Sequence, residues 1–464
     1  MSAPLLPWLI LLPLGAALIA GVTPAVRMAA ARGLTWAVLL VQCVLSLQLL
    51  SGDYARAGYR FVERGELGGV RYALGVDGLS LWLVIAVVWS APLLLLSHRQ
   101  ASRAALVAVG WLQGALVGAL CAFDLLLFFL FFEMALIPPL IVARSRGALR
   151  RVFFEWSTGL ALLAGIALLA VQYREQTGRL SFDLVELGQL LLPVETQRWY
   201  FLLFSLPFLA RLPLPPLHAP SADAAAEQAP LSGALSLLAT APLGLYGLMR
   251  VSMTLFPAGA HRAGVTLAAI GVAGILYGGL AASRQRDARG VLAYVVLAQA
   301  GLSLLGLLSI TSMGVIGALL MVVVVSLSGV IAWSAPSALS ALVIVGLPPF
   351  AGFVAQLLVF GGALRAEHLG ANGTPLSVVA ALGLTIVGVR ALWLSRAQAP
   401  RIGTRAVPVG LGALLLLGLL SGAVVERMEP AADHFARVYT AKLKTSDGHP
   451  ERRGLLERVG VGDE

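Results

Sequence analysis

Runs of consecutive apolar residues recur along the whole chain, and they restrict its fold more than any other feature of the sequence. Each run is about 18–25 residues long, which is enough to cross about 30 Å of hydrocarbon as an α-helix. A helix satisfies its backbone hydrogen bonds internally, as a segment surrounded by lipid must. Only 12% of the residues are charged, whereas soluble domains carry about 25%. The sequence therefore predicts an all-α protein that crosses a membrane many times.

We predict about fourteen transmembrane helices, joined mostly by short loops. The first apolar run is long and lacks the basic start of a signal peptide, so we expect it to be retained as a span. The predicted spans are 4–26, 33–50, 79–97, 105–122, 124–143, 153–172, 199–228, 231–256, 263–282, 290–309, 313–333, 338–364, 375–395 and 406–425.

The distribution of arginine among the loops predicts the orientation. The odd-numbered loops are strongly basic, and their only acids are Glu155 and Asp287. The even-numbered loops, with the adjoining helix ends, carry as many acids as basic residues. Because basic residues stay preferentially in the cytoplasm, we expect the odd loops there and both termini outside. The expected location is a bacterial inner membrane, crossed many times.

Two polar segments outside the spans have predicted structure of their own. The outer loop 51–78 is Gly-rich and is expected to form a hairpin through Phe61–Val62 and Arg71–Leu74. The charged tail is expected to form a surface helix around 435–443 and to be disordered from Thr445 onward.

Composition excludes several classes of function. The net charge of +10 and the pI of about 10.2 follow from loop arginines, and no basic run interleaved with aromatic residues indicates a nucleic-acid partner. The two cysteines, Cys43 and Cys121, lie in apolar runs and offer neither a disulfide framework nor a set of metal ligands. We find no nucleotide, haem, flavin or metal motif. We therefore expect no cofactor in this chain, and any redox centre would belong to another subunit.

Two predicted spans are interrupted by proline. Prolines in 212–218 break the seventh span and those in 346–349 break the twelfth. Either break taken alone is better explained as a simple kink, since proline is tolerated in membrane helices. Breaks five helices apart indicate an inverted repeat, spans 4–8 and 9–13, with a transport site near the membrane centre. The implied divisions are 1–103 with the first three helices, 104–256 and 257–396 for the two five-helix repeats, and 397–464 with the last helix and tail.

Glu133 is the sharpest candidate for chemistry. It lies in the run Phe128–Met134, well inside its predicted span. A carboxylate there is costly unless it is paired, protonated or hydrated, and such residues commonly mark ion pathways. The alternative is a structural glutamate that joins two helices.

Arg211 and His218 flank the first break. Arg211 is either the partner of Glu133 or an interfacial arginine that extends its side chain toward water. His218, with Asp223 and Glu227 after it, either lines an aqueous vestibule or caps the resumed helix.

Five strings, in order, resemble one family: the M subunit of respiratory complex I and its relatives in multisubunit sodium/proton antiporters and membrane hydrogenases. The motifs in 132–138 and 345–353, for example, are similar to the family strings "WEMMLIP" and "VGLPGTSGF". The family's proton-pathway glutamate corresponds to Glu133. The resemblance implies an antiporter-like proton-translocating subunit beside similar subunits, and covers about residues 70–365. The five strings are 72–81, 132–138, 216–218 with 228–230, 287–294 and 345–353.

The departures from the family concern its charged residues. The lysine of the seventh span corresponds to Arg211, and that of the eighth falls near Ala239. A family histidine corresponds to Gln299, and the glutamate of the twelfth span corresponds to Gln356. Arginine does not release its proton at accessible pH. We therefore expect a depleted proton-relay axis, with Glu133, Arg211 and His218 as the remaining pathway candidates.

Three functions agree with these observations. The first is a membrane-arm subunit of an NADH:quinone oxidoreductase of the complex I type, coupling electron transfer to proton translocation. The second is a subunit of a cation/proton antiporter or of an ion or inorganic-carbon uptake complex. The third is a non-pumping structural subunit of such a complex. In each, the expected partners are other membrane-arm subunits and the lipid bilayer.

The charge bias gives a testable topology. A reporter that fluoresces only in the cytoplasm should give signal when fused at Arg146, which lies in an odd loop, and none when fused at Glu464. The opposite pattern in whole cells would show that the orientation is wrong.

Overall fold

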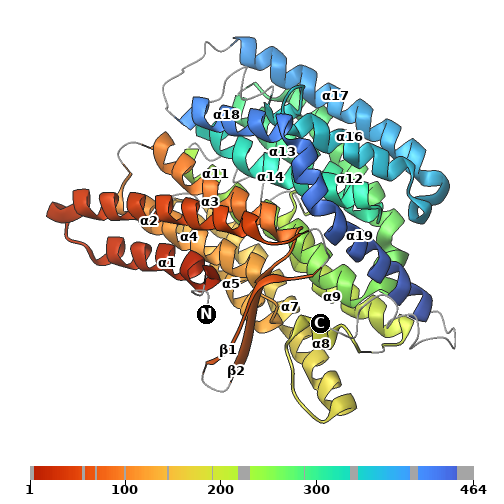
Figure 1. Cartoon of the computed structure of the whole chain (residues 1–464). Helices are drawn as coiled ribbons and strands as arrows, with labels where there is room; N and C mark the ends of the chain where they lie inside the picture. The colour runs from red at the N-terminus through yellow and green to blue at the C-terminus, as the bar shows by residue number, and fades with distance from the viewer. Residues whose placement is uncertain are drawn as a thin grey trace.

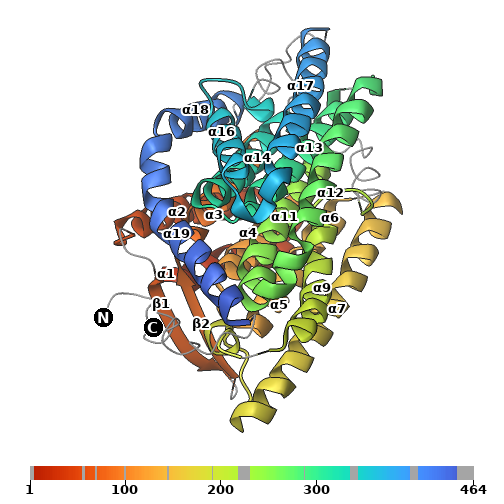
Figure 2. The ribbon, with the colours of Figure 1, turned by 90° about the vertical axis from the view of Figure 1, so that its right-hand side faces the viewer.

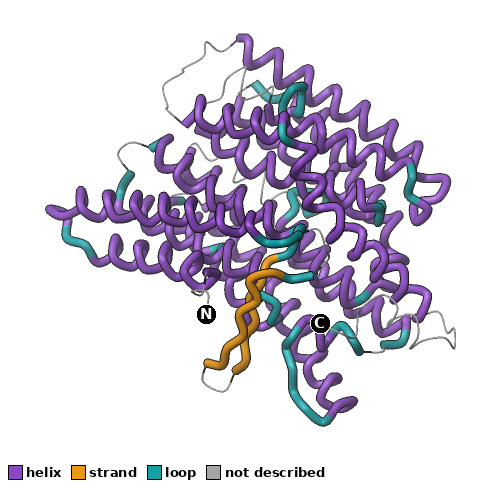
Figure 3. The backbone as a smooth tube through the Cα atoms, in the orientation of Figure 1, coloured by secondary structure: helices purple, strands orange, loops and turns teal. Residues whose placement is uncertain are grey.

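The computed structural model describes residues 5–54, 58–67, 70–98, 101–143, 146–190, 192–217, 230–286, 288–334, 343–397 and 406–446. These residues form a bundle of helices packed side by side, with one short antiparallel hairpin projecting from it (Figure 1, Figure 3). Within this part of the chain, eleven helices are long and apolar enough to cross a membrane, or twelve if a bent C-terminal pair counts as one span.

Each of the fourteen predicted spans contains a helix, so the predicted all-α, multi-span fold is confirmed. The helices are α1 (Leu5–Val22), α2 (Met28–Gln48), α3 (Ser80–Ser97), α4 (Arg103–Cys121), α5 (Leu125–Met134), α6 (Ile137–Val142), α7 (Arg146–Thr177), α8 (Leu184–Leu187), α9 (Val194–Arg211), α11 (Pro230–Gly247), α12 (Pro257–Arg284), α13 (Ala288–Leu308), α14 (Ser312–Ser334), α16 (Ala351–Leu364), α17 (Gly373–Ala397), α18 (Ala406–Leu419) and α19 (Ser421–Ser446). Shorter turns are η1 (Ala25–Arg27), η2 (Leu49–Ser51), the π-helical η3 (Leu248–Met253) and η4 (Glu367–Asn372).

Both predicted breaks are present. Helix α9 ends at Arg211, directly before the first proline-rich segment. The second break follows the helical turn 343–345, and α16 resumes at Ala351. Gly346 turns the chain there with a φ of +82°, a conformation that glycine adopts without a Cβ clash. Each break contains a cis X–Pro peptide bond, Pro215–Pro216 and Pro348–Pro349. The division into two five-helix repeats stays a prediction.

A third break was not predicted. The fifth span consists of α5, which ends at Met134, and α6, which begins at Ile137. Two prolines in the first turn of α6 lack the N–H groups that would continue the α5 ladder. The consequence is that Glu133 lies in the last turn of a helix and not in its middle.

The C-terminal prediction was partly wrong. In place of a span 406–425 and a separate surface helix 435–443, α18 ends at Leu419 and α19 runs unbroken from Ser421 to Ser446. The two helices meet at a bend of 66°. One stripe of α19, including Val424, Met428 and Ala432, is buried against the bundle, which is the spacing of an amphipathic helix. Helix α19 lies diagonally across the other helices (Figure 2), and the tail predicted to be disordered from Thr445 lies almost entirely outside the described residues.

The predicted hairpin in loop 51–78 is confirmed. Strands β1 (Arg60–Leu67) and β2 (Val70–Val76) pair in antiparallel register, with Glu63 opposite Leu74 and Leu67 opposite Val70. The Glu63 carboxylate accepts a 3.2 Å hydrogen bond from the N–H of Leu6, so the hairpin also holds the start of α1.

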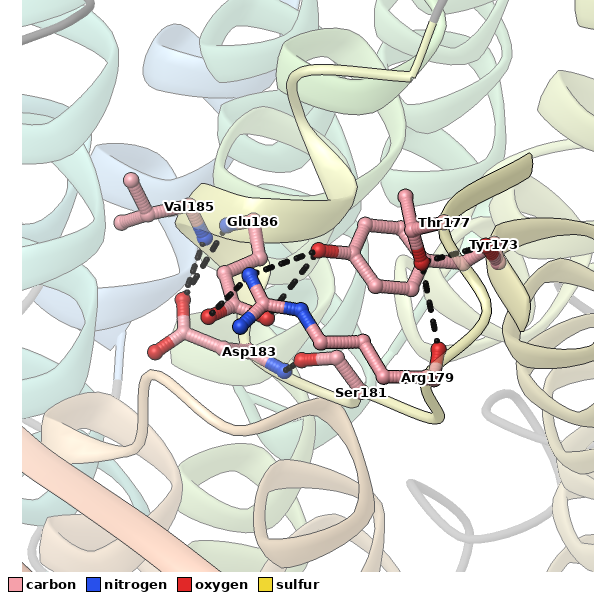
Figure 4. Close-up of polar contacts among 7 residues, drawn as sticks. All are labelled: Tyr173, Thr177, Arg179, Ser181, Asp183, Val185 and Glu186. Atoms are coloured by element: carbon pink, nitrogen blue, oxygen red, sulfur yellow. Dashed lines mark hydrogen bonds and ion pairs between the residues drawn. The ribbon is translucent and has the colours of Figure 1, made fainter.

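A polar network orders the turn between α7 and α8 (Figure 4). Arg179 lies 3.5 Å from the Glu186 carboxylate, and the Tyr173 hydroxyl donates to the same carboxylate at 3.3 Å. The Asp183 side chain accepts from the N–H groups of Val185 and Glu186, which caps α8. The network therefore stabilises one backbone conformation of this exposed turn between α7 and α8.

That turn also holds the start of α5. The Leu125 N–H donates to the carbonyl of Phe182, and the Leu184 N–H donates to the carbonyl of Phe123, both at 2.9 Å. Asp124 caps α5 by accepting from the N–H groups at its start. These hydrogen bonds therefore fix the start of α5 relative to the segment that follows α7.

A buried ion pair joins the first half of the bundle to the base of the hairpin. Asp77 precedes α3 and accepts hydrogen bonds from the N–H groups of Leu79 and Ser80. Its carboxylate also forms an ion pair with Arg250 of the π-helical turn, and both side chains are at most 10% exposed. Burial favours a raised pKa for Asp77, but the charge of Arg250 and the hydrogen bonds hold that pKa below its usual value.

We expect Asp77→Asn to destabilise the protein by about 3–5 kcal/mol, because it leaves a buried guanidinium without its carboxylate. A carboxyl with a lowered folded-state pKa stabilises the fold above its ordinary pKa, about 3.9, and this contribution is lost as the pH falls through the folded-state value. Acidification below about pH 4 should therefore destabilise the native protein more than the variant. The measurement is the thermal midpoint in mild detergent at several pH values.

The matched control is Glu195→Gln, which removes an exposed ion pair with Arg198. Such pairs contribute about 0–1 kcal/mol. If Asp77→Asn were as harmless as this control, the buried pair would not be important for stability.

Candidate functional site

Glu133 lies at the end of α5 and faces two other helices. Its Oε1 atom is 3.6 Å from the guanidinium of Arg211 on α9, and its side chain is 19% exposed. The same Oε1 is itself buried and makes no hydrogen bond. A Cβ added at Gly159 of α7 would lie 2.3 Å from this atom. The glycine thus leaves the space that the Glu133 carboxylate occupies.

Arg211 is the last residue of α9 and is only 1% exposed, which excludes the interfacial alternative for this residue. Its Nη2 donates to the Phe132 carbonyl at 2.7 Å, and its Nη1 donates to the Ala239 carbonyl at 3.3 Å. The guanidinium carbon also lies 3.4 Å from the centre of the Phe132 ring. Arg211 is therefore held by two carbonyls and a ring in addition to Glu133.

The contacts of Arg211 cap the end of α5. The last carbonyls of a helix lack intrahelical partners, and cations are favoured there. Arg211 serves the Phe132 carbonyl, and the indole N–H of Trp111 donates to the Met134 carbonyl at 3.1 Å. The break after Glu133 is thus stabilised by side chains from α9 and α4.

A second buried ion pair lies nearby on α7. The Nε of Arg151 donates to the Oε1 of Glu155 at 2.7 Å, and Nη2 donates to the Ser236 carbonyl of α11 at 3.3 Å. The two side chains are 7% and 2% exposed, so the prediction that Glu155 is a loop acid was wrong. Glu155 lies near the start of the predicted span 153–172, but α7 begins at Arg146, so the residue lies well inside the helix and not beside a loop. The i, i+4 spacing of arginine and glutamate was the available signal.

At the replaced positions, backbone carbonyls take the polar contacts. Ala239 is fully buried and contributes its carbonyl to Arg211. The Gln299 amide donates to the Ile344 carbonyl at 3.0 Å and to that of Val345 at 3.4 Å. The Gln356 amide donates to the same Val345 carbonyl at 2.6 Å. Both glutamines therefore hold the helical turn directly before the second break.

The candidate His218 lies outside the residues that the structure describes, together with Asp223 and Glu227. The geometry thus brings together Glu133, Arg211 and Ala239 in the first half, and Gln299 with Gln356 in the second. It does not place His218. Within the described residues, no group of three or more potential metal ligands occurs.

The chemistry available to the two halves differs. In the first, Glu133 and Glu155 are able to gain and lose protons, while Arg151 and Arg211 stay charged. In the second, the described helices α13, α14 and α16 carry a single charged residue, Arg289, near the start of α13. Amides donate and accept hydrogen bonds but do not titrate. The site therefore combines a titratable first half with the three helices α13, α14 and α16, whose single charged residue is Arg289.

Two broken spans, with a buried ion pair beside the first, are typical of membrane transporters built with discontinuous helices. A family model described as NADH:quinone oxidoreductase/Mrp antiporter matches residues 122–338. The chain is 28% identical to NADH-quinone oxidoreductase subunit M of Rhodobacter capsulatus, over 94% of this chain and 96% of the relative. It is 30% identical to F(420)H(2) dehydrogenase subunit M of Methanosarcina mazei, over 68% and 67%.

Solved structures agree with this match. A chain of respiratory complex I from Thermus thermophilus superposes with a TM-score of 0.81 at 26% identity, covering 94% of this chain and 99% of that one. A chain of the Mrp complex from Dietzia has the same fold, with a TM-score of 0.77 at 19% identity, over 94% of this chain and 52% of that one. The chain belongs to the NADH:quinone oxidoreductase/Mrp antiporter family of membrane subunits, and its resemblance to complex I subunit M is confirmed.

The geometry predicts unequal costs for removing the two members of the Glu133–Arg211 pair. Arg211→Met leaves a buried carboxylate and two carbonyls without their donor, and should destabilise by about 3–5 kcal/mol. Glu133→Gln should cost less, about 1–3 kcal/mol, because Arg211 keeps its two carbonyls and the Phe132 ring. Thermal midpoints of both variants and of the double variant measure the difference.

Arg198→Met is the control, since this arginine is exposed and belongs to the same helix. Equal losses for Arg211→Met and Glu133→Gln would show that the carboxylate, and not the helix end, is the main partner of Arg211.

Proposed function

We propose that this chain is an antiporter-like membrane-arm subunit of an NADH:quinone oxidoreductase of the complex I type, and that it contributes to coupling electron transfer to proton translocation. The observation that carries the proposal is Glu133, buried at a helix break beside Arg211, in a chain similar to subunit M over 94% of its length. Other membrane-arm subunits and the lipid bilayer are the proposed partners. The proposed location is a bacterial inner membrane, with both termini outside.

We further propose that the proton-relay axis is depleted. A relay needs groups that gain and lose a proton near the working pH. Arg211 does not release its proton and is held by carbonyls of α5 and α11, which favours a fixed cation over a mobile carrier. The amides of Gln299 and Gln356 are both engaged with one backbone carbonyl. Proton transfer through the second half would then depend on water and not on these side chains.

Two other functions remain as alternatives. A subunit of a cation/proton antiporter or of an ion or inorganic-carbon uptake complex would have the same fold, as the Mrp chain from Dietzia does. A structural, non-pumping subunit is favoured by the contacts of Gln299 and Gln356, which stabilise the second break without titratable groups. The antiporter or uptake alternative differs from the main proposal in its partner subunits. The structural alternative differs from it in ion flux.

The partners and the ion flux are both measurable in one preparation. The chain, purified through an affinity tag in mild detergent, should bring hydrophilic iron–sulfur subunits and similar membrane subunits with it. Reconstituted in liposomes, that complex is then assayed for protons moved per electron. We expect Glu133→Gln to leave this ratio nearly unchanged, because the relay beyond Glu133 is incomplete.

Two results would each contradict one part of the proposal. A large loss of pumping in Glu133→Gln, at unchanged assembly and electron flux, would show that the relay is complete. Purification with ion-transport subunits alone, without redox subunits, would favour the antiporter alternative. Glu195→Gln, an exposed change on α9, controls for effects of handling.

A further inference from the structure

Two carboxylate oxygens of the first half are buried and make no hydrogen bond. They are Oε1 of Glu133 on α5 and Oε2 of Glu155 on α7. The other oxygen of Glu155 is engaged by Arg151 at 2.7 Å. A buried acceptor without a donor costs about 1–3 kcal/mol. Each of these two oxygens is therefore able to accept a proton or a hydrogen bond.

The two carboxylates lie on the same side of α7. Gly159 follows Glu155 by one helical turn, and residues four apart share a helix face. A Cβ at Gly159 would meet the Glu133 carboxylate, at 2.3 Å from Oε1 and 2.8 Å from Cδ. Glu133 therefore packs one helical turn away from Glu155, with the guanidinium of Arg211 3.6 Å from its Oε1 atom.

One proton bound in this region adds a single positive charge to an otherwise balanced group of side chains. Arg151 and Arg211 supply two fixed cations, and Glu133 and Glu155 supply two carboxylates, so the group is neutral when both acids are ionised. The neighbouring helices α4 and α11 offer the Trp111 indole and backbone carbonyls here. The other charged residues of α4, α7, α8 and α9 whose placement is described lie toward the helix ends: Arg103, Arg150, Arg174, Glu175, Glu186, Glu195 and Arg198.

We propose that Glu133 and Glu155 share one transferable proton, which makes Glu155 a second proton-accepting residue of this subunit. The proton leaves the hydroxyl of one protonated carboxyl as its O–H bond breaks, and forms an O–H bond on the other carboxylate, directly or through one water. No electron moves, and both arginines stay protonated. This inference rests on the proposed function, since it assigns a further residue to the same pathway.

The geometry gives the four residues distinct roles. Arg151 fixes one oxygen of Glu155 and leaves Oε2 as the accepting atom. Arg211 fixes the end of α5, and with it the position of Glu133. Gly159 leaves the space that the Glu133 carboxylate occupies, one helical turn from Glu155. The family's lysine at the position of Arg211 is able to release a proton, whereas arginine is not. In this proposal the two glutamates carry the proton instead.

Infrared difference spectroscopy of the intact complex in membranes tests the shared proton. The carbonyl stretch of a protonated carboxyl is followed as a function of pH in native protein, Glu133→Gln, Glu155→Gln and the double variant. Two groups that share a proton titrate as a pair, with interaction of more than about one pH unit. We expect each single variant to shift the midpoint of the remaining carboxyl by at least about one pH unit, and the double variant to lose the signal.

Glu155→Asp is a second variant, which keeps the charge but withdraws the carboxylate, and it should move the Glu133 band even if Glu155→Gln does not assemble. Glu195→Gln should leave the bands unchanged. An unaltered Glu133 band and midpoint in both Glu155 variants would overturn the proposal. The spectra do not depend on pumping or on the identity of the copurifying subunits, so they separate failure of this inference from failure of the proposed function.

Discussion

The structure depends on one constraint: a charge or a backbone carbonyl buried among membrane-spanning helices must find a partner inside the protein. Three buried ion pairs satisfy it in the first half, Asp77–Arg250, Arg151–Glu155 and Glu133–Arg211. Each joins segments that would otherwise be held only by apolar packing, or fixes a helix end. Because removal of one partner leaves the other buried and unpaired, these pairs bind the helices into one arrangement.

Broken helices create the second demand. Their ends expose carbonyls that no intrahelical N–H reaches. The end of α5 is served by the cation of Arg211, whereas the turn before Gly346 is served by the amides of Gln299 and Gln356. The same structural problem is therefore solved by charge in one half and by neutral amides in the other. This difference is the physical basis for proposing a titratable first half and a second half that is mainly structural.

Much of this architecture follows from sequence patterns with a simple physical cause. Long apolar runs predicted the spans, and the prolines at 213–216 and 348–349 predicted the two broken helices. The third break was not predicted, because the apolar run 124–143 is long enough for one span. The interruption depends on Pro138 and Pro139, which lie close to the end of that run. The bend between α18 and α19 was not predicted because the apolar run 406–425 continues through it. The continuation of α19 was not predicted because the segment after Val425 is charged, although one stripe of it is buried.

By itself the sequence determined the fold class, the order of the helices, the hairpin and the identity of Glu133 and Arg211 as unusual residues. These features depend on hydrophobicity, proline and charge within short stretches of the chain, so the sequence alone reveals them. Only the tertiary structure decided which groups meet: that Arg211 caps α5 as well as facing Glu133, that Gly159 makes room for a carboxylate, and that Glu155 is buried near Glu133. These contacts join residues far apart in the chain, and such pairings follow from helix packing, which no local pattern records.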